Sequence, residues 1–350
     1  MDASSFDYDL PQSFIAQEKS DPRDASRLFH VDLTSGEERR EHLRFRDLPS
    51  ILSEGDVLVM NRSKVIPARI PVSKQTGGRA EVLLLEERPE GWEALVGGKG
   101  LKEGMTLSTG DGTTHIHLER NISQGRYSIT FSGPAREDLI KWLSAYGRMP
   151  TPPYIKGNLR KPDTYQTIYA KEDGSVAAPT AGLHFTDQLM SRLREVGVIL
   201  CEIVLHVGYG TFAPIRSDRI EDHRMEQERY WIPPESRKVL DEAVMDAGRG
   251  RYRIWPVGTT AMRTLETAYD RAGNCIAPSG RSSLYITPGY EFKIGYKGFM
   301  TNFHLPRSTP LLLVSAFWNR ERLLDAYEEA KRTGYRFYSL GDSMAIRRRR

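Results

Sequence analysis

Three histidines with similar neighbours are the residues of this sequence best suited to proton transfer or ligand binding. His184, His206 and His304 lie in short segments rich in glycine, threonine and proline, each beside an apolar run: VAAPTAGLHFT, LHVGYGTF and TNFHLP. Loops at strand ends commonly hold reactive side chains, and the unperturbed pKa of histidine lies nearest to neutral pH. Any one of them alone is better explained as a hydrogen-bonded structural residue. Three in such similar settings favour a polar functional site.

A turn that suits an anion is the second candidate feature. Residues 253–266 read RIWPVGTTAMRTLE, which predicts a strand, a tight turn and a helix. Backbone N–H groups and the helix dipole at Thr259 and Thr260 would attract a carboxylate or phosphate, and the planar fork of Arg263 could grip a carboxylate. The structural alternatives are plain capping by Thr260 and a surface ion pair for Arg263. The spacing matches neither a Walker loop nor a GxGxxG dinucleotide fingerprint.

The remaining histidines give weaker support for a metal site. His223 lies among acids in EDHRMEQE, which suits a divalent ion or an acid/base pair, but no HExxH motif is present. His115 and His117 are two residues apart and project from the same face of a predicted strand. No nearby set of carboxylates or cysteines completes a site with them. On the residues alone, a metal site is therefore the less favoured interpretation of these histidines.

The elements that must position these residues alternate between strands and helices. Apolar runs predict strands at VLVMN, VILCEIVLHVG, RIWPVG and SLYITP. Thr186 can cap a helix whose apolar stripe (Leu189, Met190, Leu193 and Val196) ends before Gly197 as the stop. Further helices are predicted over 234–248, 261–271, 309–318 and 320–333. This order is typical of a mixed α/β domain.

A different pattern interrupts this alternation after the first of the predicted strands. Between residues 70 and 133, short strand-like runs such as AEVLLLEE and GRYSITFSG are separated by glycine-rich turns, which predicts a small antiparallel β-barrel. The fold class expected is therefore α/β, with a mixed, open, barrel-like main domain and an inserted β-barrel domain. The predicted bounds are 1–69 and 150–346 for a discontinuous catalytic domain, 70–149 for the insertion and 347–350 for a basic tail.

Composition and charge exclude several classes of protein. No apolar stretch is long enough to span a bilayer, and the N-terminal MDASSFDYDLPQ lacks the apolar core of a signal peptide. Cys201 and Cys275 are the only cysteines, which excludes a disulfide framework and favours a reducing compartment, so we expect a cytoplasmic protein.

The formal charge of +4 depends on the four arginines at the end of the chain, without which the protein is close to neutral. A nucleic-acid site would therefore need a local basic surface. Its candidates, each of which is alternatively an ordinary solvated charge, are Arg39, Arg40, Arg44, Arg46, Lys64, Arg69, Arg148, Lys156, Arg160 and Lys161.

A series of motifs from Phe6 to Ile346 resembles one enzyme family in order and over essentially the whole chain. They include FDYDLP, RDASRL, GDVLVMN, VIPARI, GRMPTPPYI, SVAAPTAGLHFT, LHVGYGTF, VGTTAMRTLE, TNFHLPRST and YRFYSLGDSM. The chain is similar to the S-adenosylmethionine:tRNA ribosyltransferase-isomerases of queuosine biosynthesis. One position departs from the pattern, because Glu226 stands where the family commonly has a histidine.

The resemblance implies a ribosyl transfer without a metal or a bound cofactor. S-adenosylmethionine would be a co-substrate, and the acceptor would be 7-aminomethyl-7-deazaguanine at the wobble position of tRNA. The products would be epoxyqueuosine-tRNA, adenine and methionine. The protein would act as a monomer. Two other classes stay open on the residues alone: a non-catalytic RNA-binding protein that uses the barrel, and a metal hydrolase built on the histidines.

Roles for individual residues follow from the chemistry of this reaction. A base must remove a C5′ proton beside the sulfonium, and an acid must protonate the departing adenine. We expect His184 and His206 in these roles, with His304 and His223 next. Nucleoside contacts are expected from Thr180, Thr211 and Asn302, and contacts to the methionine carboxylate or a phosphate from Arg263, Thr259 and Thr260. For tRNA, we expect phosphate contacts from Lys64, Arg69, Arg148 and Lys156, and base stacking on Tyr154 or Tyr165.

Overall fold

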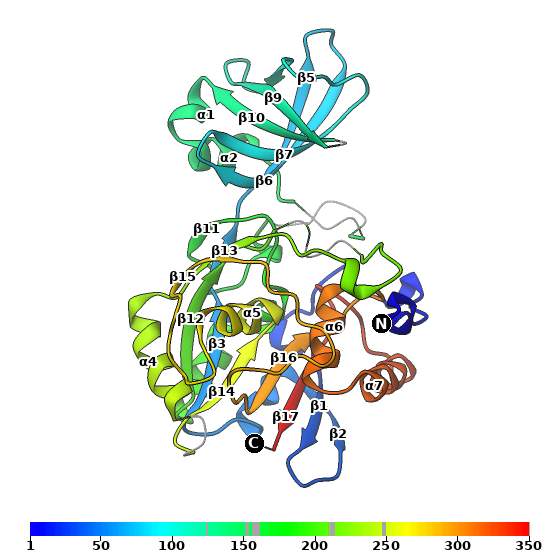
Figure 1. The fold of residues 1–350 in the computed structure, drawn as a ribbon, viewed down its shortest axis with the longest axis vertical. Coiled ribbons are helices and arrows are strands. Elements are labelled where there is room, and N and C mark those ends of the chain that lie inside the picture. The colour runs from blue at the N-terminus through cyan, green and yellow to red at the C-terminus, as the bar shows by residue number, and fades with distance from the viewer. Residues whose placement is uncertain are drawn as a thin grey trace. The chain divides into compact units, whose positions relative to one another are not determined.

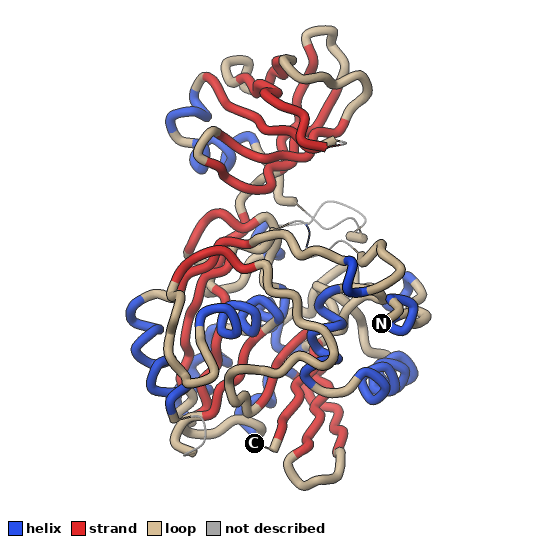
Figure 2. Tube along the Cα trace, in the orientation of Figure 1, coloured by secondary structure: helices blue, strands red, loops and turns tan. Residues whose placement is uncertain are grey.

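Two units make up the computed structural model, which describes residues 1–123, 125–150, 154–155, 162–208, 210, 214–246 and 250–349 (Figures 1 and 2). The first unit comprises Met1–Ser63, Pro153–Glu172 and Ala178–Arg350, and the second comprises Lys64–Pro152 and Asp173–Ala177. A mixed α/β unit with a large sheet and a second unit with a closed antiparallel barrel confirm the predicted fold class. Within the described ranges, no helix combines the length and the apolar character needed to cross a membrane.

A nine-stranded mixed sheet organises the first unit. Its centre consists of four parallel neighbours, in the order β12 (Ile199–Leu205), β3 (Asp56–Asn61), β14 (Arg253–Val257) and β16 (Gly298–Asn302). All residues of β3 and β16 are buried, as expected for parallel strands that are covered on both faces. The flanking strands are β1 (Arg27–Leu33), β2 (Arg39–Arg44), β13 (Glu228–Trp231), β15 (Ser279–Ser282) and β17 (Ser343–Arg348).

The direction of the central strands decides where the polar segments gather. Because these strands are parallel, their carboxyl ends meet at one edge of the sheet, where ligands of open α/β sheets usually bind. His206 follows β12, Gly258 follows β14, and Asn302 ends β16. The motifs that the sequence separates widely are therefore brought to one edge.

Helices cover the sheet and were largely predicted from periodicity and capping. They are α3 (Asp187–Glu195), α4 (Pro234–Met245), α5 (Thr259–Ala268), α6 (Thr309–Phe317) and α7 (Arg320–Arg332). The predicted cap of α3 is present, since Thr186 accepts a hydrogen bond from the Leu189 backbone N–H. Leu189 and Leu193 pack into a core with Trp255 of β14. The predicted apolar stripe was wrong at Val196, which is 40% exposed because the helix has already ended there.

One predicted strand is absent. Residues 283–288, SLYITP, are not a strand; β15 ends just before them at Ser282. The Arg263 side chain donates to the backbone carbonyl oxygens of Ser282 and Leu284, at 3.5 and 3.1 Å. The Leu284 carbonyl group, beyond the end of β15, is thus satisfied by a guanidinium, which sequence periodicity cannot indicate.

The end of the chain also differs from its prediction as a basic tail. Arg347 and Arg348 continue β17 and pair with Asp32 and Leu33 of β1. The Arg348 guanidinium lies 4.6 Å from the centre of the Phe317 ring. Strand pairing and this cation–π contact explain why two of the four arginines are part of the sheet.

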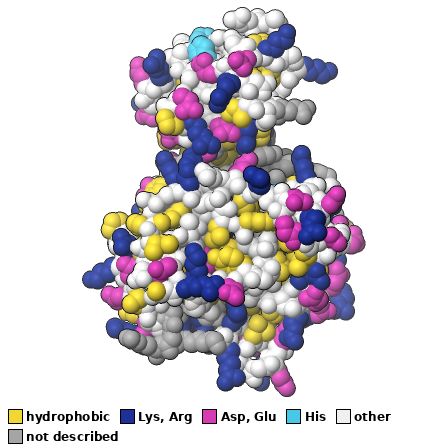
Figure 3. All heavy atoms as spheres, viewed as in Figure 1, with side chains coloured by type: hydrophobic (Ala, Val, Ile, Leu, Met, Phe, Trp, Pro, Cys, Tyr) yellow, Lys and Arg dark blue, Asp and Glu magenta, His cyan; other side chains and the backbone are white. Residues whose placement is uncertain are grey.

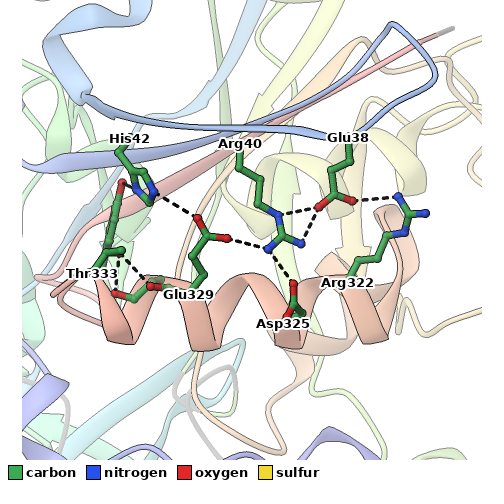
Figure 4. A network of polar contacts seen from close by, with 9 residues as sticks. Glu38, Arg40, His42, Arg322, Asp325, Glu329 and Thr333 are labelled. Atoms are coloured by element: carbon green, nitrogen blue, oxygen red, sulfur yellow. Dashed lines mark hydrogen bonds and ion pairs between the residues drawn. The ribbon is translucent and has the colours of Figure 1, made fainter.

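The edge strand β2 is tied to helix α7 by charged side chains (Figure 4). Arg40 forms ion pairs with Glu38, Asp325 and Glu329 at 2.6–2.8 Å. Charged residues on an exposed edge strand discourage pairing with other chains, and here a helix also covers them. Arg40 is therefore occupied by carboxylates and is a poor candidate for an RNA contact.

The second unit contains the predicted small barrel. Six antiparallel strands close in the order β10-β7-β6-β5-β8-β9, with apolar residues alternating into the interior. Their bounds are β5 (Arg69–Lys74), β6 (Arg79–Arg88), β7 (Gly91–Gly97), β8 (Thr106–Thr109), β9 (His115–Ser123) and β10 (Arg126–Ser132). Helices α1 (Pro134–Glu137) and α2 (Leu139–Tyr146) follow the barrel, and β4 (Ser63–Val65) pairs with β11 (Glu172–Ser175).

Candidate functional site

A cavity of about 550 Å³, part of it open to solvent, lies at the carboxyl edge of the central strands. We call it the central cavity. Its described wall carries hydroxyl, amide and imidazole groups but no side chain of Asp, Glu, Lys or Arg. The lining residues are Ala178, Pro179, Thr180, Ala181, Val207, Gly258, Thr259, Thr260, Thr301, Asn302, His304, Ser308, Pro310, Tyr338 and Ser339.

His184 lies behind this wall, at the end of the short 3₁₀ helix Thr180–His184. Its Nδ1 is 2.8 Å from Ser26 Oγ, and its Nε2 accepts a hydrogen bond of 3.1 Å from the Asn302 amide. The ring stacks on Phe45 at 4.9 Å. Burial, helped by nearby arginines, lowers the pKa of His184 to about 3. Both ring nitrogens thus have protein partners, and the neutral imidazole holds Asn302.

Asn302 links the buried histidine to the cavity. It donates to His184 and to the Tyr338 carbonyl oxygen, while Thr180 Oγ1 lies 3.5 Å from its amide oxygen. Tyr338 has φ of +74°, which is unusual for a bulky residue and is found mainly where structure around a site enforces it. The amide of Asn302 is thereby fixed in the wall beside Thr180.

His304 is the histidine that lines the central cavity itself. Its Nε2 lies 2.7 Å from Thr301 Oγ1, and its backbone N–H donates to the Tyr327 hydroxyl. Among the described residues, none forms a hydrogen bond with the other ring nitrogen, Nδ1. Burial lowers the pKa of His304 to about 3, so the ring is neutral at pH 7. A neutral, oriented imidazole can accept a proton from a ligand in the cavity.

His206 occupies a different environment, directly after β12. The residue is 8% exposed, and neither ring nitrogen has a hydrogen-bond partner within the described parts of the chain. The ring meets Trp231 edge-on at 5.1 Å. Burial, and to a lesser degree Arg229, lowers the pKa of His206 to about 4. Buried polar atoms are normally paired, so the lack of a described partner at both nitrogens, next to Val207 of the cavity wall, makes His206 a candidate for ligand contact.

Thr259 and Thr260 begin helix α5 and line the central cavity. Gly258 precedes them with φ of +86°, a conformation that glycine adopts without strain. Within the described part of the chain, no side-chain cap is seen at the start of this helix. The predicted strand, turn and helix are therefore present, and the predicted capping role of Thr260 is not.

Arg263 has a different partner from the predicted ligand. Its Nη1 pairs with Glu228 Oε2 at 2.5 Å, and both side chains are almost fully buried. The other carboxylate oxygen of Glu228 accepts a hydrogen bond of 2.9 Å from the Gly208 backbone N–H. The pair therefore connects α5 to the loop that carries His206. Arg263 does not line the central cavity, although it borders a second hollow described below.

The other histidines are not part of the central cavity. His223 is partly buried against Tyr285, at 5.4 Å between ring centres, and burial lowers its pKa. In the barrel, His117 has hydroxyl partners at both ring nitrogens, Thr106 at 3.1 Å and Ser132 at 2.9 Å. The described residues include no group of three or more His, Cys, Asp or Glu arranged to hold a metal.

The two tyrosines predicted to stack on a base lie close to the wall. Tyr165 is fully buried, so its ring faces are not available to a base, and that prediction is corrected for this residue. Tyr154 donates to Ser339 Oγ and packs on Tyr338 with ring centres 4.1 Å apart. Tyr154 thus supports two lining residues.

Three of the residues predicted to contact phosphates, Lys64, Arg69 and Arg148, are described by the structure and belong to the second unit. Arg69 and Arg148, distant in sequence, form a β-bridge through their backbones. Arg69 also pairs with Glu81, and Lys64 lies 3.3 Å from Asp173. On the face drawn in Figure 3, basic and acidic side chains are interspersed on both units. Four predicted residues, Lys156, Arg160, Lys161 and Thr211, lie outside the described residues.

Four residues at the site were missed by sequence reasoning. Glu228 was considered only as one acid near His223, and Tyr338, Ser339 and Ser308 only as letters in family motifs. A buried acid facing a buried arginine leaves no local sequence signal, because its partner is on a distant strand or helix. Glu226 is the position that departs from the family pattern. Its side chain lies close to the loop that follows His206, since a Cβ added to Gly210 would be 2.7 Å from a carboxylate oxygen of Glu226.

Comparisons with known proteins give one consistent result. A family model described as queuosine biosynthesis protein matches residues 3–346. A crystal structure of S-adenosylmethionine tRNA ribosyltransferase from Thermotoga maritima is similar, with 35% sequence identity and a TM-score of 0.54. The similarity covers 98% of this chain and 100% of the Thermotoga chain.

Proposed function

Because the chain belongs to the queuosine biosynthesis protein family, we propose that it transfers and isomerises the ribosyl group of S-adenosylmethionine onto tRNA. The family indicated by the sequence motifs is confirmed, and the enzyme is a transferase. The acceptor we propose is 7-aminomethyl-7-deazaguanine at the wobble position, and the product is epoxyqueuosine-tRNA. Adenine and methionine leave. One observation carries the proposal: five motif segments meet around a single cavity whose described wall has no charged side chain of Asp, Glu, Lys or Arg.

The proposed reaction needs two proton movements that a histidine can perform. The sulfonium acidifies the C5′ hydrogens, a base removes one of them, and the electron pair released opens the ribose as the bond to adenine breaks. The substrate amine then adds to the ribose-derived chain. Closure of the epoxide by an oxygen of that chain breaks the C5′–S bond and releases methionine as a neutral thioether. The base and the acid for adenine must both lie near the ribose.

We assign the first proton transfer to His304. Its Nδ1 is the acceptor if Nε2–H donates to Thr301 Oγ1, and the 2.7 Å contact between Nε2 and Oγ1 fits this arrangement. The proton taken from C5′ leaves an imidazolium at His304. It can therefore pass its proton to the departing adenine, so one residue serves as base and then as acid.

The other two candidate histidines receive different roles. His184, with both nitrogens bonded to protein, is a positioning residue for Asn302. Asn302 and Thr180 then contact the nucleoside. His206, with two unpaired nitrogens, is the second residue proposed to contact the substrate. His223 lies outside the central cavity and is proposed only as a neighbour of the second hollow.

For tRNA, we propose phosphate contacts by the basic residues Lys64, Arg69 and Arg148, with Lys156 retained from the sequence pattern. Phosphate contacts position an RNA without reading its sequence. We further propose that the enzyme is a cytoplasmic monomer with one discontinuous catalytic domain and one inserted domain. These correspond to the first and second units, so the insertion begins at Lys64 and not at residue 70. Light scattering of the purified protein, with and without tRNA, tests the monomer.

The deciding experiment is chromatographic detection of adenine and methionine. The protein is mixed with S-adenosylmethionine and tRNA that carries the aminomethyl-deazaguanine, and unmodified tRNA serves as the control. We expect both products only with the modified tRNA. If tRNA binds but neither product forms, the protein is a non-catalytic RNA-binding protein. Activity that a chelator abolishes would instead favour the metal hydrolase.

A further inference from the structure

The N-terminus of helix α5 is open toward the central cavity. The first N–H groups of a helix have no partner within the helix. Here no side-chain cap comes from the residues that the structure describes, and Gly258, Thr259 and Thr260 all line the cavity. The helix is ten residues long, so its dipole places partial positive charge at this end.

The hydroxyl group of Thr260 gives a second, independent indication of a ligand. Thr260 is 6% exposed, and its Oγ1 is buried without a hydrogen-bond partner among the described residues. A Cβ placed on Gly258 would lie 3.8 Å from this oxygen, so the hydroxyl faces the turn that opens into the cavity. Orphaned buried hydroxyl groups are uncommon in native proteins, because leaving them unpaired is costly.

Helix α6 begins at the same cavity but is capped. Ser308 Oγ accepts from the Leu311 backbone N–H, and Pro310 has no N–H to offer. Ser308 and Pro310 nevertheless line the cavity, so the α6 dipole also ends there. Two helix N-termini therefore face a wall whose described residues include no charged side chain of Asp, Glu, Lys or Arg. The partial positive charge of both helix ends favours an anion here, and at α5 no side-chain cap among the described residues competes for the first N–H groups.

We propose that the N-terminus of α5, with the Thr260 hydroxyl, binds the α-carboxylate of S-adenosylmethionine, and that Arg263 takes no part in this contact. The inference rests on the proposed function for the identity of the ligand. The sequence pattern assigned one contact to Arg263, Thr259 and Thr260 together. The structure distinguishes Arg263 from the two threonines, because its guanidinium is bonded to Glu228, Ser282 and Leu284.

The surroundings favour a carboxylate over a phosphate of tRNA. A phosphate in a polynucleotide is usually met by lysine or arginine, and the described wall has neither. Next to the site is a second hollow of about 260 Å³, which shares Thr259 and Pro310 with the central cavity. Its other walls include Met225, Leu284 and Leu313. Arg263 also lines this hollow, with its guanidinium bonded to Glu228, Ser282 and Leu284.

Substrate and enzyme variants together test the proposal. Adenine release is measured with S-adenosylmethionine and with its decarboxylated analogue, for the wild type, Thr260→Val and Thr264→Val. Thr264 is a matched control, since it lies one turn further along α5, is fully buried, and its hydroxyl donates to the Thr260 carbonyl oxygen. We expect Thr260→Val to raise KM for S-adenosylmethionine about tenfold, the scale of one hydrogen bond to a charged group. KM for the decarboxylated analogue should be unchanged, and Thr264→Val should change neither KM.

Three outcomes would overturn the proposal: an equal rise of both KM values, a rise of KM for tRNA instead of S-adenosylmethionine, or an Arg263→Lys variant that loses preference for the carboxylate. Equilibrium binding of the two compounds by calorimetry, without tRNA, separates this proposal from the proposed function. A preference for S-adenosylmethionine that Thr260→Val abolishes would support the carboxylate site even if no adenine were released.

Discussion

At the scale of single residues, burial determines what each histidine can do. Burial lowers the pKa of His184 and His304 to about 3 and that of His206 to about 4. All three are therefore neutral at physiological pH. Their bonding to other described residues then distinguishes them: His184 has partners at both nitrogens, His304 at one, and His206 at neither.

These shifts predict a stability that falls on acidification. Between the unfolded histidine pKa of about 6.5 and the folded value, the unfolded chain binds more protons, so the free energy of unfolding decreases as pH falls. For His304, the loss should be about 2 kcal/mol between pH 7 and pH 5. Urea unfolding of the wild type and of His304→Gln measures it, and the variant should have the shallower pH dependence. Equal slopes would contradict the buried, neutral state.

The same variant tests the proposed proton transfer. Glutamine can still bond to Thr301 but cannot carry a proton, so His304→Gln should lower kcat by about 10²- to 10⁴-fold while KM for S-adenosylmethionine changes little. An unchanged kcat would remove His304 from the mechanism. His184→Gln, as a positioning variant, should mainly raise KM through Asn302.

At the scale of elements, the Glu228–Arg263 pair fastens three segments near the site. Arg263 belongs to α5, Glu228 begins β13, and the Gly208 backbone N–H bonds to the carboxylate. Arg263 also fixes the segment after β15 through two carbonyl groups. Arg263 therefore stabilises the segments to which it is bonded. This role explains its burial better than substrate contact does.

Removing the charge of Glu228 should therefore impair both stability and catalysis. Glu228→Gln leaves a buried guanidinium uncompensated, and the free energy of unfolding should fall by about 3 kcal/mol. The adenine-release kcat/KM should fall as well, because the loop beside His206 loses its charged anchor. Glu291→Gln is the control: its partner Arg271 is exposed, so the change should be below about 0.5 kcal/mol. If Arg263→Ala raised KM strongly while Glu228→Gln did not, direct substrate binding by Arg263 would be the better account.

At the scale of the whole molecule, binding of a large polyanion depends on the distribution of basic residues. The described candidates Lys64, Arg69 and Arg148 belong to the second unit, whereas the central cavity belongs to the first. Surface charges of both signs are interspersed in Figure 3. RNA affinity must then come from a limited number of phosphate contacts and not from a strong net charge.

The salt dependence of tRNA binding measures the number of phosphate contacts. Replacing Lys64, Arg69 and Arg148 together by alanine should reduce the slope of log K against log salt for tRNA binding by about 2 to 3, since each phosphate contact contributes about 0.7 to 0.9. Lys238→Ala on the exposed side of α4 is the control and should leave the slope unchanged. An unaltered slope in the triple variant would place the tRNA contacts elsewhere.

Sequence alone determined the features that depend on local pattern. Alternation in the barrel strands, the Thr186 cap of α3 and the strand–turn–helix of α5 follow from periodicity and backbone sterics, and ordered motifs identified the family. Tertiary structure decided which residues interact. It determined which histidine has hydrogen bonds at both ring nitrogens and that Arg263 pairs with Glu228. It also determined that residues 283–288 are not a strand and that Arg347 and Arg348 belong to the sheet. The physical reason is that burial, hydrogen bonds and pKa values depend on residues brought together across the parallel strands. No local window contains both members of such a pair.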